Sequence, residues 1–379
     1  MINVVHVITG LNVGGAERAL LRLLANRTAS HFNPSVISLL DKGIIGPQIQ
    51  SLGVPVYPLG MTRGVPGPRA LIDLRRLLKK LDPDVIQGWM YHGNLAATIA
   101  APFLGRRVSV LWNVRQSLYG LAKERWLTRQ VICGSAWLSR SPKIILYNSK
   151  ISALQHEAMG FKVEKTRVIP NGFDCHEYYP DKGAREQVRK EFNIPPNTVL
   201  VGLLARYHPM KDHANFLQAA ARLMKEEAGI NVAFLLAGRG IDPSNGLLIG
   251  LICRLGLSSK VILLGERQDV PSLITALDIA TVSSAWGEGF PNVLGEAMAC
   301  GIPCVATDVG DSAYLIADTG KIVSPRDPQA LAAAWQVLIG AGVKGRKRLG
   351  EKARRRIAEH FNLPEIVRQY EQLYLEVTS

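Results

Sequence analysis

Short apolar runs alternate with segments of helical periodicity along almost the whole chain. Mostly apolar runs such as residues 4–8, 85–87 and 277–282 are typical of central parallel strands, which are buried on both faces. Amphipathic stretches, for example residues 71–81 and 150–159, separate such runs. This alternation predicts an α/β fold with doubly wound, mostly parallel sheets. Because 379 residues exceed the usual size of one hydrophobic core, we expect two domains.

The strand at residues 277–282 leads into a loop of small residues and then into a helix. Pro291 and Asn292 favour a helix start, and Gly301 and Pro303 favour its end. A strand end, a flexible loop and a helix N-terminus therefore meet within about twenty residues. This arrangement presents open backbone N–H groups, which favour an anion and phosphate above all.

Two carboxylates flank this turn. Glu288 lies in the loop and Glu296 about one turn into the helix, while Gly289 and Phe290 between them offer backbone N–H groups to a ligand. Because carboxylates repel phosphate, we expect the two glutamates to accept hydrogen bonds from neutral hydroxyls, such as those of a sugar or a ribose. Taken alone, they would equally fit a solvated loop and a stabilised first helical turn.

The E-x7-E spacing from Glu288 to Glu296 resembles the signature of the retaining family-4 glycosyltransferases of group 1. The resemblance runs almost without a break over residues 283–307, in the form E-G-F-P-N-V-L-x-E-A-M-A-C-G-x-P. It implies the GT-B fold, in which two Rossmann-like doubly wound domains face each other across a cleft. We expect an acceptor-side domain at residues 1–177 and a nucleotide-sugar-binding domain at residues 184–361. The helix at residues 363–379 is expected to pack back on the first domain, and residues 178–183 to act as the hinge.

Five further positions resemble residues of the family that face the donor. Gly14 and Gly15 match a G-G-x-E loop whose backbone lies close to the diphosphate and the sugar, although a tight turn between strand and helix is the alternative. His92, expected in the loop after the strand at residues 85–87, matches a histidine that faces the donor sugar. Arg206 and Lys211 match the diphosphate-binding pair, and two cations at the carboxyl end of a strand suit that group.

The resemblance therefore implies a catalytic set and a donor-binding set. Gly238 and Arg267 lie in two loops that contact the nucleotide in the family, largely through the backbone. The expected catalytic residues are His92, Glu288, Arg206 and Lys211. The expected donor-binding residues are Gly14, Gly15, Gly238, Arg267, Gly289, Phe290, Pro291, Asn292 and Glu296.

The net charge of +14 and the isoelectric point near 9.7 favour phosphorylated ligands or an anionic membrane surface. No basic stripe interleaved with aromatic residues is present, so we expect no nucleic-acid partner. The sequence shows no apolar run of membrane-spanning length and no signal region, and its five cysteines are scattered singly. We expect a cytoplasmic protein that can sit peripherally on the inner face of the membrane. The D-x-D sequence at residues 82–84 is interpreted as a turn, and we expect neither a metal nor a cofactor.

The expected function is transfer of a sugar, with retention of configuration and without a metal, from a nucleotide-diphosphate sugar to a glycan or lipid-linked acceptor. UDP is the nucleotide that the family favours, and the setting would be synthesis of cell-surface polysaccharide or glycolipid. The alternatives are a nucleotide-sugar epimerase or a phosphorylase of the same fold, and a non-catalytic nucleotide-sugar-binding protein.

Overall fold

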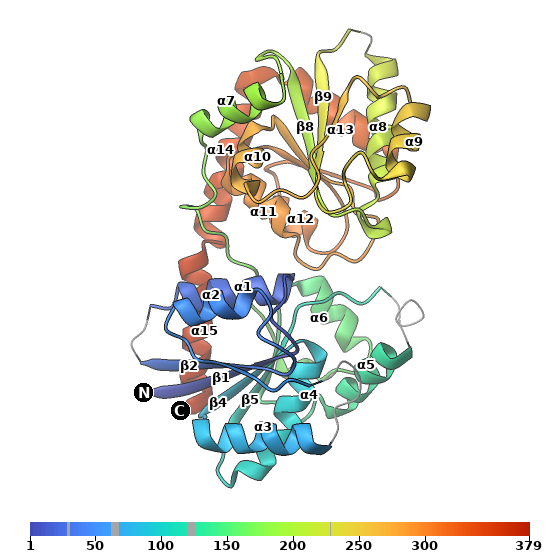
Figure 1. The fold of residues 1–379 in the computed structure, drawn as a ribbon. Coiled ribbons are helices and arrows are strands. Elements are labelled where there is room, and N and C mark those ends of the chain that lie inside the picture. Colours follow the sequence, from blue (N-terminus) through green and yellow to red (C-terminus); the bar gives the residue numbers. More distant parts are fainter. Residues whose placement is uncertain (29–30, 62–67, 120–125, 228) are drawn as a thin grey trace. The chain divides into compact units, whose positions relative to one another are not determined.

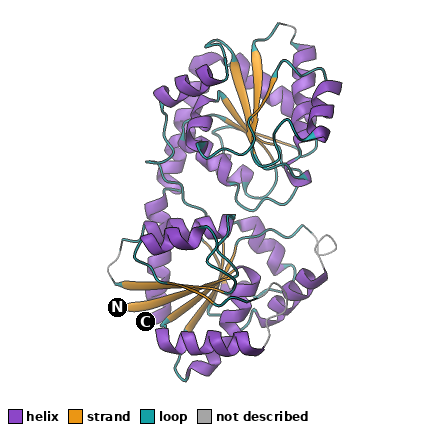
Figure 2. Cartoon of the chain, in the orientation of Figure 1, coloured by secondary structure: helices purple, strands orange, loops and turns teal. Residues whose placement is uncertain are grey.

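The computed structural model describes residues 1–28, 31–61, 68–119, 126–227 and 229–379. For residues 68 and 69 it describes the backbone only. The chain forms two compact units (Figure 1). Unit 1 comprises Met1–Gly172 and Leu363–Ser379, and unit 2 comprises Phe173–Asn362. In both units helices surround a central sheet (Figure 2).

Unit 1 contains a seven-stranded parallel sheet in the order β3-β2-β1-β4-β5-β6-β7. Its strands are β1 (Ile2–Ile8), β2 (Phe32–Ser38), β3 (Val56–Pro58), β4 (Val85–Trp89), β5 (Ser109–Val114), β6 (Ile144–Tyr147) and β7 (Thr166–Val168). Its helices are α1 (Gly15–Ala25), α2 (Ile45–Ser51), α3 (Pro68–Leu81), α4 (Met90–Ala100), α5 (Trp126–Leu138), α6 (Lys150–Glu157) and α15 (Leu363–Thr378). The part of the expected helix at residues 120–125 lies outside the described residues.

Unit 2 contains a six-stranded parallel sheet in the order β10-β9-β8-β11-β12-β13. Its strands are β8 (Val199–Leu204), β9 (Val232–Ala237), β10 (Val261–Leu263), β11 (Ile279–Val282), β12 (Cys304–Thr307) and β13 (Lys321–Val323). Its helices are α7 (Lys182–Glu191), α8 (His213–Glu226), α9 (Gly246–Arg254), α10 (Val270–Ala276), α11 (Asn292–Ala299), α12 (Ser312–Ile316), α13 (Pro328–Gly340) and α14 (Gly342–His360).

Each sheet has one point at which the strand order reverses. In unit 1 this point lies between β1 and β4, and in unit 2 between β8 and β11. The prediction of two doubly wound α/β units is confirmed. Ligands of such sheets bind outside the carboxyl ends of the strands at the reversal point, so the loops after these four strands position any site.

The two units divide between Gly172 and Phe173, a few residues before the boundary expected from the sequence. Phe173 is fully buried in the core of unit 2, where its ring stacks on Phe290 with centroids 6.2 Å apart. Residues 178–183, the expected hinge, also belong to unit 2, and Asp181 caps α7 by accepting the Ala184 N–H at 3.0 Å. The proline and charged residues of this segment reflect a helix start rather than a free linker.

Helix α15 belongs to unit 1, although it is the last element of the chain. Tyr370 and Tyr374 are buried in the same core as the strands β1 and β4. The Tyr374 hydroxyl donates to Gln87 Oε1 of β4 at 2.6 Å in this interior. The amphipathic pattern of residues 363–378 therefore serves to complete the core of unit 1.

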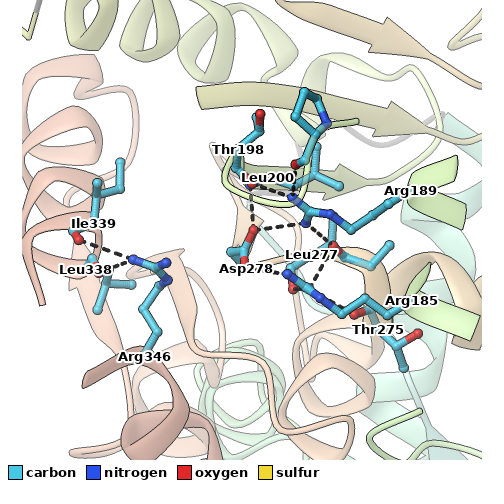
Figure 3. Close-up of polar contacts among 12 residues, drawn as sticks. Arg185, Arg189, Thr198, Leu200, Thr275, Leu277, Asp278, Leu338, Ile339 and Arg346 are labelled. Atoms are coloured by element: carbon cyan, nitrogen blue, oxygen red, sulfur yellow. Dashed lines mark hydrogen bonds and ion pairs between the residues drawn. The ribbon is translucent and has the colours of Figure 1, made fainter. Parts of the chain in front are cut away.

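A partly buried cluster of ions holds α7 against the sheet of unit 2 (Figure 3). Asp278, directly before β11, accepts from Arg185 Nη2 at 2.8 Å, from Arg189 Nη1 at 3.2 Å and from the Leu200 N–H at 2.8 Å. Arg185 also donates to the carbonyls that end α10, and burial lowers the pKa of Arg189. Arg346 donates separately to the carbonyls at the end of α13.

Candidate functional site

The loops after β8 and β11 are joined to each other at the reversal point of unit 2. The Ser283 hydroxyl donates to the Lys211 carbonyl at 2.8 Å, and the Ala285 N–H donates to the Met210 carbonyl at 2.8 Å. Thr307 Oγ1 of β12 donates to the Ser284 carbonyl at 2.6 Å. These bonds hold two long loops in one conformation and so fix the side chains that they carry.

Lys211 and Glu288 form an ion pair between these loops. The Ser284 hydroxyl also donates to Glu288 Oε1, at 2.5 Å. Glu288 is only 7% exposed, so its carboxylate is largely removed from water and depends on these partners. The two residues were expected to contact different parts of the donor, yet here they are directly paired.

A cavity of about 220 Å³ adjoins this pair at the start of α11. Lys211, Ser284, Glu288, Pro291 and Asn292 are among the residues that line it. Pro291 occupies the N-cap position of α11 and makes no side-chain capping bond. The first turn therefore presents backbone N–H groups and the positive end of the helix dipole beside a lysine, which suits an anionic group.

Backbone contacts join the neighbouring loops to this site. Gly238 has φ +144°, and a Cβ there would overlap the Ala205 carbonyl, so the loop after β9 can approach the loop after β8 this closely only with glycine. The Tyr207 N–H donates to the Arg239 carbonyl at 2.8 Å. Arg206, at the beginning of the same loop, is exposed and makes no hydrogen bond or ion pair with the described residues.

Other residues of the expected donor-binding set make contacts within unit 2. Glu296 lies one turn along α11 and is buried. The Arg267 guanidinium donates to Glu191 Oε1 at 3.0 Å and to Asp269 Oδ2 at 2.8 Å, and these bonds raise its pKa. Phe290 packs in the core, and the Gly289 carbonyl accepts the Asp311 N–H at 2.8 Å. Their roles toward a donor stay predictions.

In unit 1 the expected glycine loop leads into α1, and Gly14 occupies the N-cap position of that helix. A Cβ on Gly14 would overlap the Glu17 carboxylate. Burial raises the pKa of Glu17. A Cβ on Gly15 would meet nothing within 4 Å, so the packing of the protein does not itself require glycine at this position. Space beside Gly15 is compatible with close approach of a ligand.

His92 lies on α4 and not in the loop that the sequence suggested, because β4 passes directly into the helix at Met90. The sequence predicts this helix at residues 95–103, whereas α4 begins earlier, at Met90. His92 is exposed, and desolvation by its neighbours lowers its pKa. It lines, with Glu17 of α1 and with Gly10 and Asn12 of the loop after β1, a mostly apolar cavity of about 620 Å³.

Three polar residues of unit 2 were not predicted from the sequence. Ser284 was seen only as part of a small-residue loop, although a hydroxyl four residues before Glu288 can reach its carboxylate. His213 and Asn215 are buried polar residues in the first turn of α8. Asp212, the N-cap residue of this helix, was the signal in the sequence that could have located them.

In the part of the chain that the structure describes, no three or more His, Cys, Asp and Glu side chains gather in a way that could hold a metal ion. None of the helices described is at once long and apolar enough to cross a bilayer.

Two family models match the chain. The model described as "Glycosyl transferase 4-like domain" matches residues 14–172, and the model described as "Glycosyl transferases group 1" matches residues 195–341. Together they cover most of both units.

Among curated proteins, the chain is 23% identical over 316 residues to the UDP-Gal:alpha-D-GlcNAc-diphosphoundecaprenol alpha-1,3-galactosyltransferase of Escherichia coli, covering 82% of this chain and 79% of that protein. It is 31% identical over 214 residues to the N-acetyl-alpha-D-glucosaminyl L-malate synthase of Bacillus anthracis, covering 56% and 54%. Among solved structures, Anabaena HepE in complex with UDP is 22% identical with a TM-score of 0.86, covering 99% of this chain and 100% of HepE. The last comparison shows the fold alone.

Proposed function

Because the chain belongs to the group 1 glycosyltransferases and has their GT-B fold, we propose that it transfers a sugar from a UDP-sugar to a glycan or lipid-linked acceptor. The observation that carries this proposal is the Lys211–Glu288 pair at the N-terminus of α11, which combines a cation, open N–H groups and a carboxylate in one cavity. UDP is supported by the complexes of the Anabaena protein with UDP and with UDP-glucose. Synthesis of cell-surface polysaccharide or glycolipid is supported by the acceptor named for the Escherichia coli relative.

The proposed reaction depends on electrostatic stabilisation of the leaving group. Lys211 and the exposed Arg206 would neutralise the diphosphate as charge develops on it, and the first turn of α11 would add backbone donors. Glu288 would orient the sugar through its hydroxyls, and Glu296 would accept from the ribose. His92 would contact the sugar or the acceptor. We propose retention of configuration and no metal, since the two cations supply the charge that a metal would bring.

Thermal-shift measurements on chelator-treated protein test the donor site. UDP-sugars are expected to stabilise the protein by about 2.7 kcal/mol at 100 times their Kd, since a ligand that binds only the folded state contributes by mass action. The Arg206→Ala/Lys211→Ala variant should lose this shift, whereas Lys347→Ala/Arg348→Ala, which removes two exposed cations of α14, should keep it. A stronger shift with GDP- or ADP-sugars would reassign the base. No shift with any series would contradict the assignment of the donor site.

Turnover of the Glu288→Ala variant distinguishes an enzyme from a non-catalytic binding protein. A non-catalytic binding protein would lose affinity alone, whereas an enzyme loses turnover even at saturating donor. An epimerase would convert the nucleotide-sugar without an acceptor, and a phosphorylase would require inorganic phosphate.

We also propose a peripheral contact with an anionic membrane through α5. Trp126 and Trp137 are 69% and 68% exposed and lie eleven residues apart, hence on one face of the helix. Arg129 of α5 and Arg140, two residues beyond its end, are also exposed. Exposed indoles beside cations are typical of helices that lie in a membrane interface.

Sedimentation with vesicles that contain anionic lipid tests this contact. The Trp126→Ala/Trp137→Ala variant should bind roughly tenfold more weakly or worse, the equivalent of 1.4 kcal/mol. The matched control is Leu247→Ala/Val343→Ala, which removes two exposed apolar side chains of unit 2. Binding should weaken as salt is raised. Failure of the unaltered protein to bind at low salt would disprove the contact.

A further inference from the structure

A second cavity of unit 2 lies on the other side of the loop that carries Lys211. Its volume is about 530 Å³, within the range of pockets that hold small molecules. Tyr207, Asp212, His213 and Asn215 line it from the loop and the first turn of α8. Leu248 and Leu251 of α9, Trp286 and Arg326 complete its wall.

One polar side chain of this wall is buried without hydrogen-bond partners. His213 and Asn215 are each 3% exposed, and the amide atoms of the Asn215 side chain bond to no described residue. Burial lowers the pKa of His213 to about 4, although a hydrogen bond with the Ala205 backbone opposes the shift. The ring is therefore neutral at pH 7, and the nitrogen that does not contact Ala205 can donate to or accept from a ligand.

Buried polar groups of this kind are normally satisfied, because leaving them unpaired is unfavourable. Here the Asn215 amide carries two N–H donors and an acceptor oxygen, and the His213 ring keeps one further nitrogen, in the wall of one cavity. Such a set suits a ligand that carries both hydroxyl donors and hydroxyl acceptors. A site built in this way also discriminates strongly against ligands that lack the matching groups.

The remaining wall combines aromatic rings with balanced charge. The Tyr207 ring lies 5.4 Å from that of His213, and the Arg326 guanidinium lies 5.3 Å from the centre of the Trp286 ring. Arg326 and Asp212 carry opposite charges, and the Asp212 carboxylate accepts the Asn215 N–H at 3.2 Å. The lining has no excess of positive charge, which favours a neutral ligand over a phosphate. Aromatic faces provide apolar surface on which a ring can stack.

We propose that this cavity binds a neutral sugar unit of a glycan, at a site separate from the donor cavity. The choice of a sugar rests in part on the proposed function, because a glycan is the proposed acceptor, whereas the existence of a polar ligand site rests on His213 and Asn215. The two cavities share the loop at residues 205–212 but not its side chains, since Lys211 lines the donor cavity and Tyr207 lines this one.

Titration of the full-length protein with methyl glycosides of glucose, galactose and N-acetylglucosamine tests this site. Binding is followed by NMR through the side-chain amides of protein labelled with 15N-asparagine, which include the amide of Asn215. Tyr207→Ala removes a ring that is 39% exposed and should leave the fold intact. Its control is Tyr314→Ala on α12, where the ring is 41% exposed. Glu288→Gln alters the donor cavity instead.

At least one glycoside should shift a side-chain amide saturably. Tyr207→Ala should weaken this binding by roughly tenfold or more, while Tyr314→Ala and Glu288→Gln should leave it within about twofold. If Glu288→Gln weakens the binding and Tyr207→Ala does not, the sugar lies in the donor cavity and the proposal is overturned. Binding of inorganic phosphate in place of the glycosides, or no glycoside binding, would also overturn it. UDP binding tested on the same samples reports separately on the donor site.

Discussion

A Lys211→Met variant is expected to lose sugar transfer by a factor of roughly 100 to 1,000 in kcat/KM, the loss that follows removal of one preorganised group from a transition-state site. Lys211 is the cation that β8 and its loop place at the N-terminus of α11, where the proposed leaving diphosphate would lie. The measurement is initial-rate kinetics with the donor found by thermal shift. Lys225→Met, which removes an exposed lysine of α8, is the matched control and should retain activity.

The ion pair with Glu288 makes a sharper test possible. Lys211→Met should also lower the free energy of unfolding by about 1–3 kcal/mol, because a largely buried carboxylate loses its counter-ion. Adding Glu288→Gln removes that charge and should restore most of the stability, while transfer stays low. If the double variant instead recovers activity, Lys211 serves only to neutralise Glu288, and its proposed contact with the diphosphate is wrong.

The fold was accessible from the sequence because local signals and topology agree. Buried parallel strands produce mostly apolar runs, such as residues 4–8 and 279–282, and the loops at strand ends carry the glycines and charges that a ligand site requires. The structure accordingly places Lys211 and Glu288 at one strand-order reversal, and Gly14 and His92 at the other.

The direct pairing of side chains could not be predicted in the same way. Lys211 and Glu288 are 77 residues apart, and their contact depends on the backbone bonds between two loops. Asp278 lies 93 residues from Arg185, which follows a segment that reads as a linker because it contains proline and charged residues. Such segments resemble helix caps as much as hinges, and only the packing of Phe173 in the core of unit 2 separates the two interpretations.

An Asp278→Ala variant is expected to lower the free energy of unfolding by roughly 1–3 kcal/mol, the cost of leaving partly buried donors without their acceptor. Two guanidinium groups would lose their carboxylate, and the Leu200 N–H would lose its acceptor at the start of β8. Urea denaturation measures the loss. Hydrogen exchange should place the lost protection in α7, α10 and β11, since these elements meet at Asp278.

Two further variants show how much of this stability loss is due to the charge of Asp278 and how it compares with the loss of an exposed ion pair. Glu351→Ala removes an exposed ion pair of α14, in which Lys347 Nζ lies 3.9 Å from Glu351 Oε1, and should cost less than about 1 kcal/mol. Asp278→Asn keeps an oxygen for the Leu200 N–H but removes the negative charge, so its loss should lie between the other two. If Asp278→Ala costs no more than Glu351→Ala, the backbone carbonyls that Arg185 and Arg189 also contact are sufficient to hold α7, and the carboxylate is dispensable.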